Sequence, residues 1–192
     1  GERWDLDVQK PLNFMGDWEG QLRARVHKDG ARHKRTGSDY FIYPRSCFTK
    51  IPEFAVGRAG WDNWMIFHTR WQGWPLVDFS RALTVIHQNH DYGHLPDGAR
   101  HYDLPETAVN VRLAGGRRTI FTLRDHTHIF NGDDLIKKKL DWESFWREVE
   151  IFPLVGLHSR FLGFISFALF HPVKAFREIK GWLNYKINQI TK

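Results

Sequence analysis

The chain has one cysteine, Cys47, and two methionines among its 192 residues. A single cysteine excludes a disulfide within the chain, which fits a reducing compartment. The length allows one domain of ordinary size with a buried core and an appended segment. The chain opens GERWDLDV, without an initiator methionine or an apolar leader, so we expect a processed product or a piece of a longer protein.

No apolar run in the chain is long enough to predict a membrane span. The most apolar stretch covers residues 151–170, and Pro153, His158 and Arg160 interrupt it. A spanning helix needs about 20 consecutive apolar residues, so this stretch fails as a span. Internal repeats and low-complexity tracts are also lacking. We therefore expect a main part at residues 1–150 and an apolar and basic helical tail at 151–192.

Most of the excess positive charge lies in the tail. The formal net charge is +6, with eleven histidines in addition, and residues 171–192 carry a net +4 from five Lys or Arg and one Glu. An apolar stripe at three- and four-residue spacing predicts a basic amphipathic helix: Val173, Phe176, Ile179, Leu183, Ile187 and Ile190. Such a helix packs on its own domain, which we favour, or lies on an anionic membrane surface.

Periodicity and turn residues predict strands alternating with helices, which is typical of the α/β class. Strands are expected at residues 1–9, 38–43, 75–79 and 82–87, and helices at 15–26, 61–72, 105–114 and 141–149. Loops are expected at 27–37 and 124–134, whereas 118–123 fits either a strand or a helix. Of the nine Trp and fifteen Phe, most should be core, with a minority free to stack on sugar rings.

Chemistry-bearing groups are densest between residues 37 and 94. Four stretches carry the signal: GSDYFIYPRSCF (37–48), IPEFAVGRAGWDNWM (51–65), VDFSRALTVIHQNHDYGHL (77–95) and LPETAVNVRLAGG (104–116). In this order and spacing they resemble bacterial glycosyltransferases of the GT-A superfamily, related to family 2. The resemblance covers most of residues 37–116. It implies an α/β fold with a mixed sheet flanked by helices, namely the second half of a GT-A fold, which holds the acceptor site and the catalytic base.

The resemblance also implies a nucleoside diphosphate sugar donor, a glycan acceptor and a divalent cation, Mn²⁺ or Mg²⁺. Family members bind the nucleotide in a first half with an acidic metal motif, which this chain lacks. We expect that half on the same parent protein or on another chain. Asp5 and Asp7 form an Asp-x-Asp pair, but they lie downstream of that motif, and a surface strand end explains them equally well.

Asp62 is the predicted general base. Inverting sugar transfer needs a carboxylate that takes the proton of the acceptor hydroxyl, and Asp62 is the only acid in GRAGWDNWM. Gly57 and Gly60 leave room there for a substrate, and a position near a helix N-terminus should favour the anionic form. The alternative is that Asp62 is a helix-capping acid.

His87 is the predicted metal ligand, because GT-A enzymes often use one downstream histidine. It ends an apolar strand and opens the HQNHDYGH loop; His90 is the second choice, assigned to the substrate. The alternative for each is a histidine hydrogen-bonded within its loop, which we prefer for His94. The cluster does not have the spacing of a fixed zinc motif.

Three further residues are predicted to bind substrate. Arg58 could meet a phosphate, or form an ordinary salt bridge. Asp39 could accept a sugar hydroxyl, or shape its loop. Trp61 could wall the acceptor site, whereas Trp64, three residues later, fits the core.

The leading hypothesis is thus an inverting, metal-assisted glycosyltransferase of cell-surface polysaccharide or glycoconjugate synthesis, with no nucleic-acid partner. We expect it in the cytoplasm, with the inner membrane face as a further location if the tail binds lipid. One alternative is a metal-dependent hydrolase or nuclease built on His87, His90 and His94. Another is a non-catalytic module that binds carbohydrate or docks on membranes.

Overall fold

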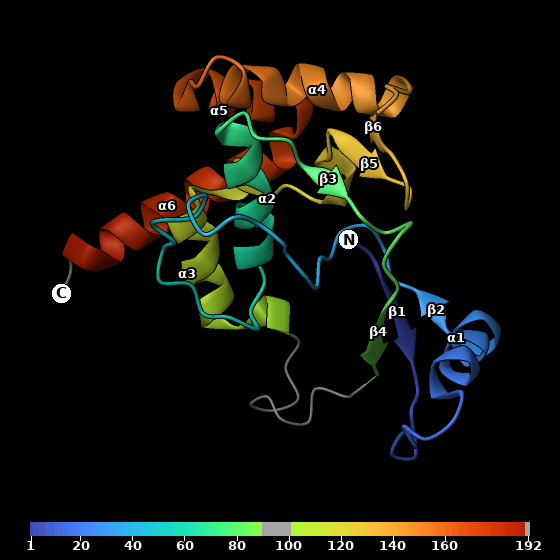
Figure 1. The fold of residues 1–192 in the computed structure, drawn as a ribbon. Coiled ribbons are helices and arrows are strands. Elements are labelled where there is room, and N and C mark those ends of the chain that lie inside the picture. The colour runs from blue at the N-terminus through green and yellow to red at the C-terminus, as the bar shows by residue number, and fades with distance from the viewer. Residues whose placement is uncertain (90–100, 191–192) are drawn as a thin grey trace.

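The structure, a computed structural model, describes residues 1–89 and 101–190. Within these residues the fold is mixed α/β, with six α-helices and two small three-stranded sheets (Figure 1), which confirms the α/β class. The strands are β1 (Arg3–Leu6), β2 (Ala31–Arg32), β3 (Val77–Asp78), β4 (Val85–Gln88), β5 (His128–Phe130) and β6 (Leu135–Lys137). The helices are α1 (Trp18–Asp29), α2 (Trp61–Trp71), α3 (Pro105–Ala114), α4 (Trp142–Val155), α5 (Arg160–Phe170) and α6 (Pro172–Ile190).

The first sheet joins distant parts of the chain around β1. Its order is β2-β1-β4, with β2 antiparallel and β4 parallel to β1, and Asp5 stands opposite both Ala31 and His87. α1 lies beside this sheet (Figure 1), and its Val26 is buried. The Asp17 carboxylate caps α1 by accepting from the backbone N–H of Gly20, as expected for an aspartate before a helix. The helix nevertheless runs on to Asp29, into the expected loop.

The second sheet was missed in part by the sequence prediction. Its order is β3-β5-β6, with β3 and β5 parallel and β5 and β6 antiparallel. β5 falls within residues 124–134, where a loop was expected. The Asn131 side chain accepts from the backbone N–H groups of Asp133 and Asp134, and Gly132 has a φ of 115°. An Asn-Gly pair between short apolar runs is a hairpin signal that the polar residues around it obscured.

The expected strand at residues 38–43 is wrong, because this segment pairs with no strand in the described chain. Its side chains have unrelated environments: Ser38 is buried, Phe41 packs edge-on against Trp61, and Ile42 is 79% exposed. Aromatic and β-branched residues favour a strand only when a neighbouring strand pairs with them. Residues 118–123 likewise form no strand. They run from one 3₁₀ turn, Arg117–Thr119, to the start of another, Leu123–Asp125; a third such turn is His101–Asp103.

α2 is the central helix of the core (Figure 1). Its Trp64, Met65, Ile66 and Phe67 are buried, and they pack in one cluster with Phe121 and with apolar residues of α3 and α4: Ala114, Ile151, Leu154 and Val155. The helix ends as predicted, since Gly73 has a φ of 69° and its N–H bonds to the Arg70 carbonyl. α3 also has its expected bounds, with Pro105 at the first turn and Gly115 after the last.

α4 and α5 pack side by side over one end of α2 (Figure 1). Gly163 permits their close contact, because a Cβ there would lie 2.7 Å from the Leu154 Cβ. The Ser166 hydroxyl donates to the Glu150 carbonyl at 2.7 Å. α4 extends beyond the expected helix at residues 141–149. It therefore crosses residue 150, the expected boundary between the main part and the tail. No helix in the described residues is long and apolar enough to cross a membrane.

Phe121 is the side chain on which this core should depend most. It is fully buried, contacts Phe67 edge-on and lies under the Arg147 guanidinium. Phe121→Ala should therefore lower the free energy of unfolding by about 3–5 kcal/mol, through lost burial and a cavity. Urea denaturation measures this, with Ile42→Ala as the exposed control, expected within about 0.5 kcal/mol of the unaltered chain. Equal losses in the two variants would contradict the core assignment.

Candidate functional site

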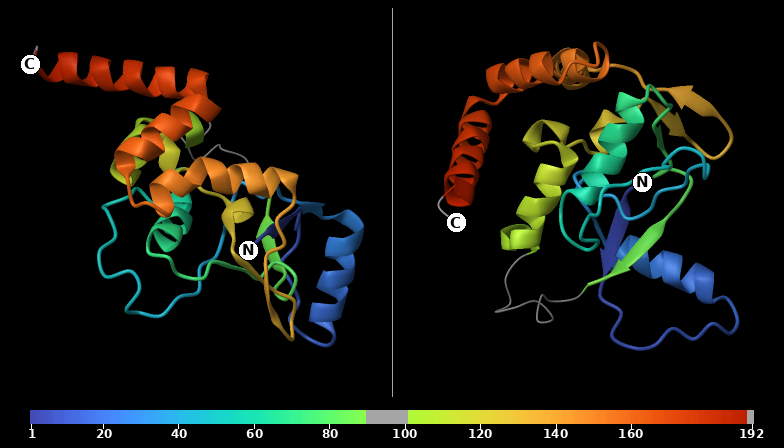
Figure 2. Two further views of the ribbon diagram at one scale, coloured as in Figure 1. Left: turned by 90° about the horizontal axis from the view of Figure 1, so that it is seen from above. Right: turned by 90° about the vertical axis from the view of Figure 1, so that its left-hand side faces the viewer.

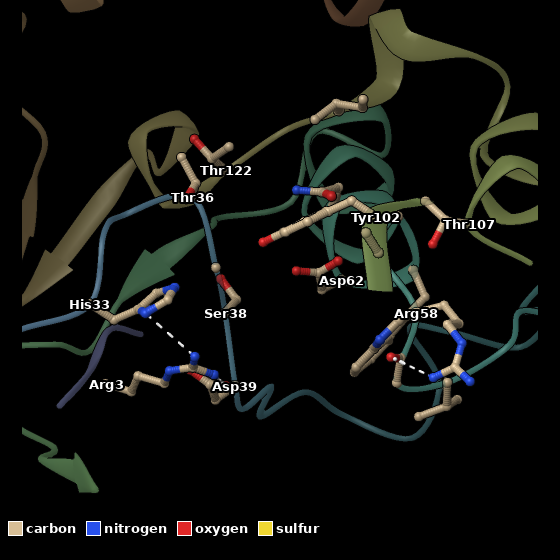
Figure 3. Close-up of a pocket in the computed structure, with 18 of the residues that line it drawn as sticks. Arg3, His33, Thr36, Ser38, Asp39, Arg58, Asp62, Tyr102, Thr107 and Thr122 are labelled. Atoms are coloured by element: carbon tan, nitrogen blue, oxygen red, sulfur yellow. Dashed lines mark hydrogen bonds and ion pairs between the residues drawn. The ribbon is translucent and has the colours of Figure 1, made fainter. Parts of the chain in front are cut away.

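A pocket of about 1160 Å³ lies between the first sheet, the segment before α2 and the residues around α3 (Figure 3). Five of the six predicted site residues line it: Asp39, Arg58, Trp61, Asp62 and His87. The sixth, His90, lies outside the described residues, as does His94. The structure thus brings together groups that are up to 48 positions apart in the sequence.

Asn110 of α3 fixes the segment that leads into α2. Its side chain is fully buried; its Oδ1 accepts from the Ala55 backbone N–H at 2.9 Å, and its Nδ2 donates to the Ala55 carbonyl at 2.9 Å and the Ala59 carbonyl at 3.2 Å. Gly60 follows with a φ of 109°, and a Cβ there would lie 3.3 Å from the Asn110 Cβ. This position therefore requires glycine on grounds of both conformation and space.

Asp62 occupies the first turn of α2. The N-cap residue is Gly60, which makes no side-chain cap bond, so Asp62 does not hold the N-cap position. Burial raises the pKa of the Asp62 carboxyl, and the backbone hydrogen bonds of Asn63 and Gly60 offset only part of this effect. The expectation that the helix N-terminus would favour the anion is therefore wrong in its net direction, because desolvation outweighs it.

The carboxylates on the other side of the pocket have the opposite environment. Arg3 donates to Asp5 at 2.8 Å and to Asp39 at 2.6 Å. Burial raises the pKa of Asp5, but the hydrogen bond from His33 and the charge of Arg3 outweigh it and hold the pKa below its ordinary value. In Figure 3, Arg3, His33 and Asp39 form one group, and Asp62 lies apart from it. The pocket therefore separates carboxylates paired with a cation from one that is desolvated.

Asp5 lies between two imidazoles. Its Oδ2 is 2.8 Å from His33 Nδ1 and its Oδ1 is 3.4 Å from His87 Nδ1. A carboxylate at one ring nitrogen is the usual way in which proteins orient a metal-binding histidine. Asp5 itself is already paired with Arg3, however, and among the described residues no group of three or more His, Cys, Asp or Glu is placed to hold a metal ion. His87 and Asp5 therefore fit a ligand and its orienting group but are not a complete site.

The other residues singled out from the sequence lie in the pocket, in the core or on the surface. Arg58 lines the pocket and donates to the Gly57 carbonyl at 3.3 Å, and no ion pair of Arg58 is found among the described residues. Trp61 lines the pocket and packs against Phe41, whereas Trp64 is buried and stacks on His68, as expected for a core residue. Asp7, the second acid of the Asp-x-Asp pair, is exposed and does not line the pocket.

Sequence reasoning missed several pocket residues. Arg3 was not singled out, and His33 was expected only as part of the loop at residues 27–37. Tyr102, Thr107 and Thr122 also line the pocket (Figure 3). Arg3 and Asp5 are two residues apart, so both lie on the same face of a short strand. This spacing was the only local signal for these pocket residues.

Comparison of the chain with protein-family models, with curated proteins and with solved structures finds no match. The pocket and the motifs of the sequence are therefore the features from which a function can be proposed.

The role of Asn110 can be tested by stability. Asn110→Ala leaves the buried backbone groups of Ala55 without their partner and should lower the free energy of unfolding by about 1–3 kcal/mol. Chemical denaturation measures it, with Asn184→Ala on an exposed face of α6 as the matched amide control. An unchanged midpoint for Asn110→Ala would show that this segment does not depend on the amide.

The pKa of Asp62 can be tested by carboxyl NMR titration. Asp62 should titrate above its ordinary value of 3.8, whereas Asp141, which caps α4 by accepting from the Ser144 N–H, should titrate below it. A raised folded-state pKa means that protonation stabilises the fold; this contribution is complete below the unfolded pKa and is lost as the pH rises through the folded pKa. Asp62→Asn should therefore be more stable than the unaltered chain at neutral pH. A lower stability, or a lowered Asp62 pKa, would contradict the desolvation.

Proposed function

We propose that this chain forms the acceptor side of an inverting glycosyltransferase that uses a nucleoside diphosphate sugar, with Asp62 as the general base. The observation that carries the proposal is the position of Asp62: a carboxylate with a burial-raised pKa, in a pocket shared with the other described residues that the sequence motifs predict. The GT-A resemblance of residues 37–116 supplies the reaction class.

Four aspartates line the pocket, and their surroundings select among them. Asp5 and Asp39 each pair with Arg3. Despite the burial of Asp5, His33 and Arg3 hold its pKa below the ordinary value, which weakens Asp5 as a base. Asp103 is exposed. Asp62 has no ion pair within the described chain, and its desolvation favours uptake of a proton. It is therefore the carboxylate best suited to accept the proton of an acceptor hydroxyl.

The proposed reaction is a single displacement. The acceptor hydroxyl donates its proton to Asp62 as its oxygen bonds to the anomeric carbon. The bond from that carbon to the diphosphate oxygen breaks at the same time, and its electron pair leaves on the diphosphate. Trp61 supplies an aromatic wall for a sugar ring, and Arg3 holds one oxygen of Asp39, leaving the other to accept from a sugar hydroxyl. Arg58 meets anionic groups of the substrate.

The leaving diphosphate requires positive charge, for which a divalent cation, Mn²⁺ or Mg²⁺, is the proposed cofactor. His87, oriented by Asp5, is the ligand proposed from this chain. The other ligands lie outside the described residues in this proposal, as does the nucleotide-binding half. The hydrolase alternative needs His90 and His94 together with His87, and the first two lie outside the described residues.

Asp62→Asn tests the base in a protein that unites this chain with a nucleotide-binding half. Loss of a general base should reduce sugar transfer by about 10²–10⁴-fold, while binding of the nucleotide sugar stays unchanged. Steady-state transfer assays and calorimetry measure the two effects separately.

Two further variants make this test specific. Asp133→Asn, in the exposed turn between β5 and β6, is the matched control and should keep full activity. Asp103→Asn tests the exposed aspartate of the pocket. Full transfer by Asp62→Asn together with loss in Asp103→Asn would assign the base to Asp103 instead. Hydrolysis of phosphodiesters without any sugar transfer would favour the hydrolase.

A further inference from the structure

α6 attaches to the body through a face other than its apolar stripe. Ala175 is buried, and the Glu178 carboxylate accepts from the Arg117 backbone N–H at 2.8 Å and pairs with Arg118 at 3.4 Å. The expectation that the stripe packs on the domain is therefore wrong. Its central residues are exposed by 68% at Phe176, 44% at Ile179, 47% at Leu183 and 56% at Ile187.

Lysines border this stripe on both sides. At 3.6 residues per turn, Phe176, Ile179, Leu183 and Ile187 fall within an arc of roughly 80°, with Lys180 just beyond one edge and Lys186 just beyond the other. Both lysines are exposed. A narrow apolar stripe with cationic borders is the pattern of helices that lie in the interface of a membrane, with their lysines reaching the headgroups.

Exposed apolar side chains also occur on α5, which directly precedes α6 in the chain: Phe161 is 72% and Leu169 is 76% exposed. Figure 2 shows that the last turns of α6 extend beyond the rest of the chain. An exposed apolar stripe bordered by charge is typical of a binding surface.

The charges favour an anionic lipid surface over a second copy of this chain. Residues 171–192 carry a net +4, and Glu178, their one acid, is already paired with Arg118. Stripe-to-stripe pairing of two copies would bring lysines together with no free acid to neutralise them, whereas an anionic bilayer neutralises them and accepts the apolar side chains.

We propose that α6 binds an anionic membrane surface, with Phe176, Ile179, Leu183 and Ile187 inserted between lipids and Lys180 and Lys186 at the headgroups. This binding does not depend on the glycosyltransferase proposal, because α6 makes it without any group of the pocket.

Vesicle flotation of the full chain tests the proposal. The chain should float with vesicles of phosphatidylcholine and phosphatidylglycerol and bind pure phosphatidylcholine at least about tenfold more weakly. Phe176→Ser with Leu183→Ser should weaken binding to the anionic vesicles about tenfold or more, and so should Lys180→Glu with Lys186→Glu. High salt should also weaken binding, because it screens the lysines.

Phe14→Ser with Met15→Ser is the matched control, since these apolar residues are 65% and 78% exposed outside the tail. It should bind as the unaltered chain does, and circular dichroism should show every variant folded. Equal binding to neutral and anionic vesicles, or unchanged binding by the stripe variant, overturns the proposal. So does sedimentation that shows a dimer which the stripe substitutions dissociate, because the stripe would then be a self-association surface.

Discussion

The buried amide of Asn110 is the interaction on which the geometry of the pocket depends. Residues 55–59 belong to no helix or strand, and the backbone N–H of Ala55 and the carbonyls of Ala55 and Ala59 bond instead to one side chain of α3. Those bonds place Gly60 against α3 in a left-handed conformation that favours glycine, and α2 begins at the next residue. The positions of Trp61 and Asp62 follow from that start.

The carboxylates of the pocket have two kinds of surroundings. Asp5 and Asp39 are paired with Arg3, and Asp5 also contacts His33 and His87. Asp62 is desolvated, with only backbone N–H groups to favour its charge. Environments that push the protonation of neighbouring acids in opposite directions are a mark of sites that divide acid, base and charge-stabilising roles. This division supports a base at Asp62 and cation binding near His87.

Apolar residues of the C-terminal helices face either the core or the solvent. α4 and α5 direct Ile151, Leu154 and Phe167 inward, where Gly163 lets the helices approach closely. α6 is held by Ala175 and Glu178 instead and leaves its stripe exposed. The same residue types thus serve the core in one helix and an outward surface in the next, because a single ion-paired acid sets how α6 is rotated.

The sequence by itself determined the elements whose limits are local. The limits of α2 and α3 were predicted to within a residue, because a proline at the first turn and a glycine after the last act through neighbouring residues alone. The motifs also predicted five of the residues that line the pocket, but not Arg3 or His33. Strand pairing, burial and helix rotation were decided by the tertiary structure: residues 38–43 have no partner strand, and the alignment of β1 with β4 brings Asp5 to His87. The tertiary structure also decided the direction of the Asp62 pKa shift and the exposure of the α6 stripe, because each depends on which distant surface excludes water from a side chain.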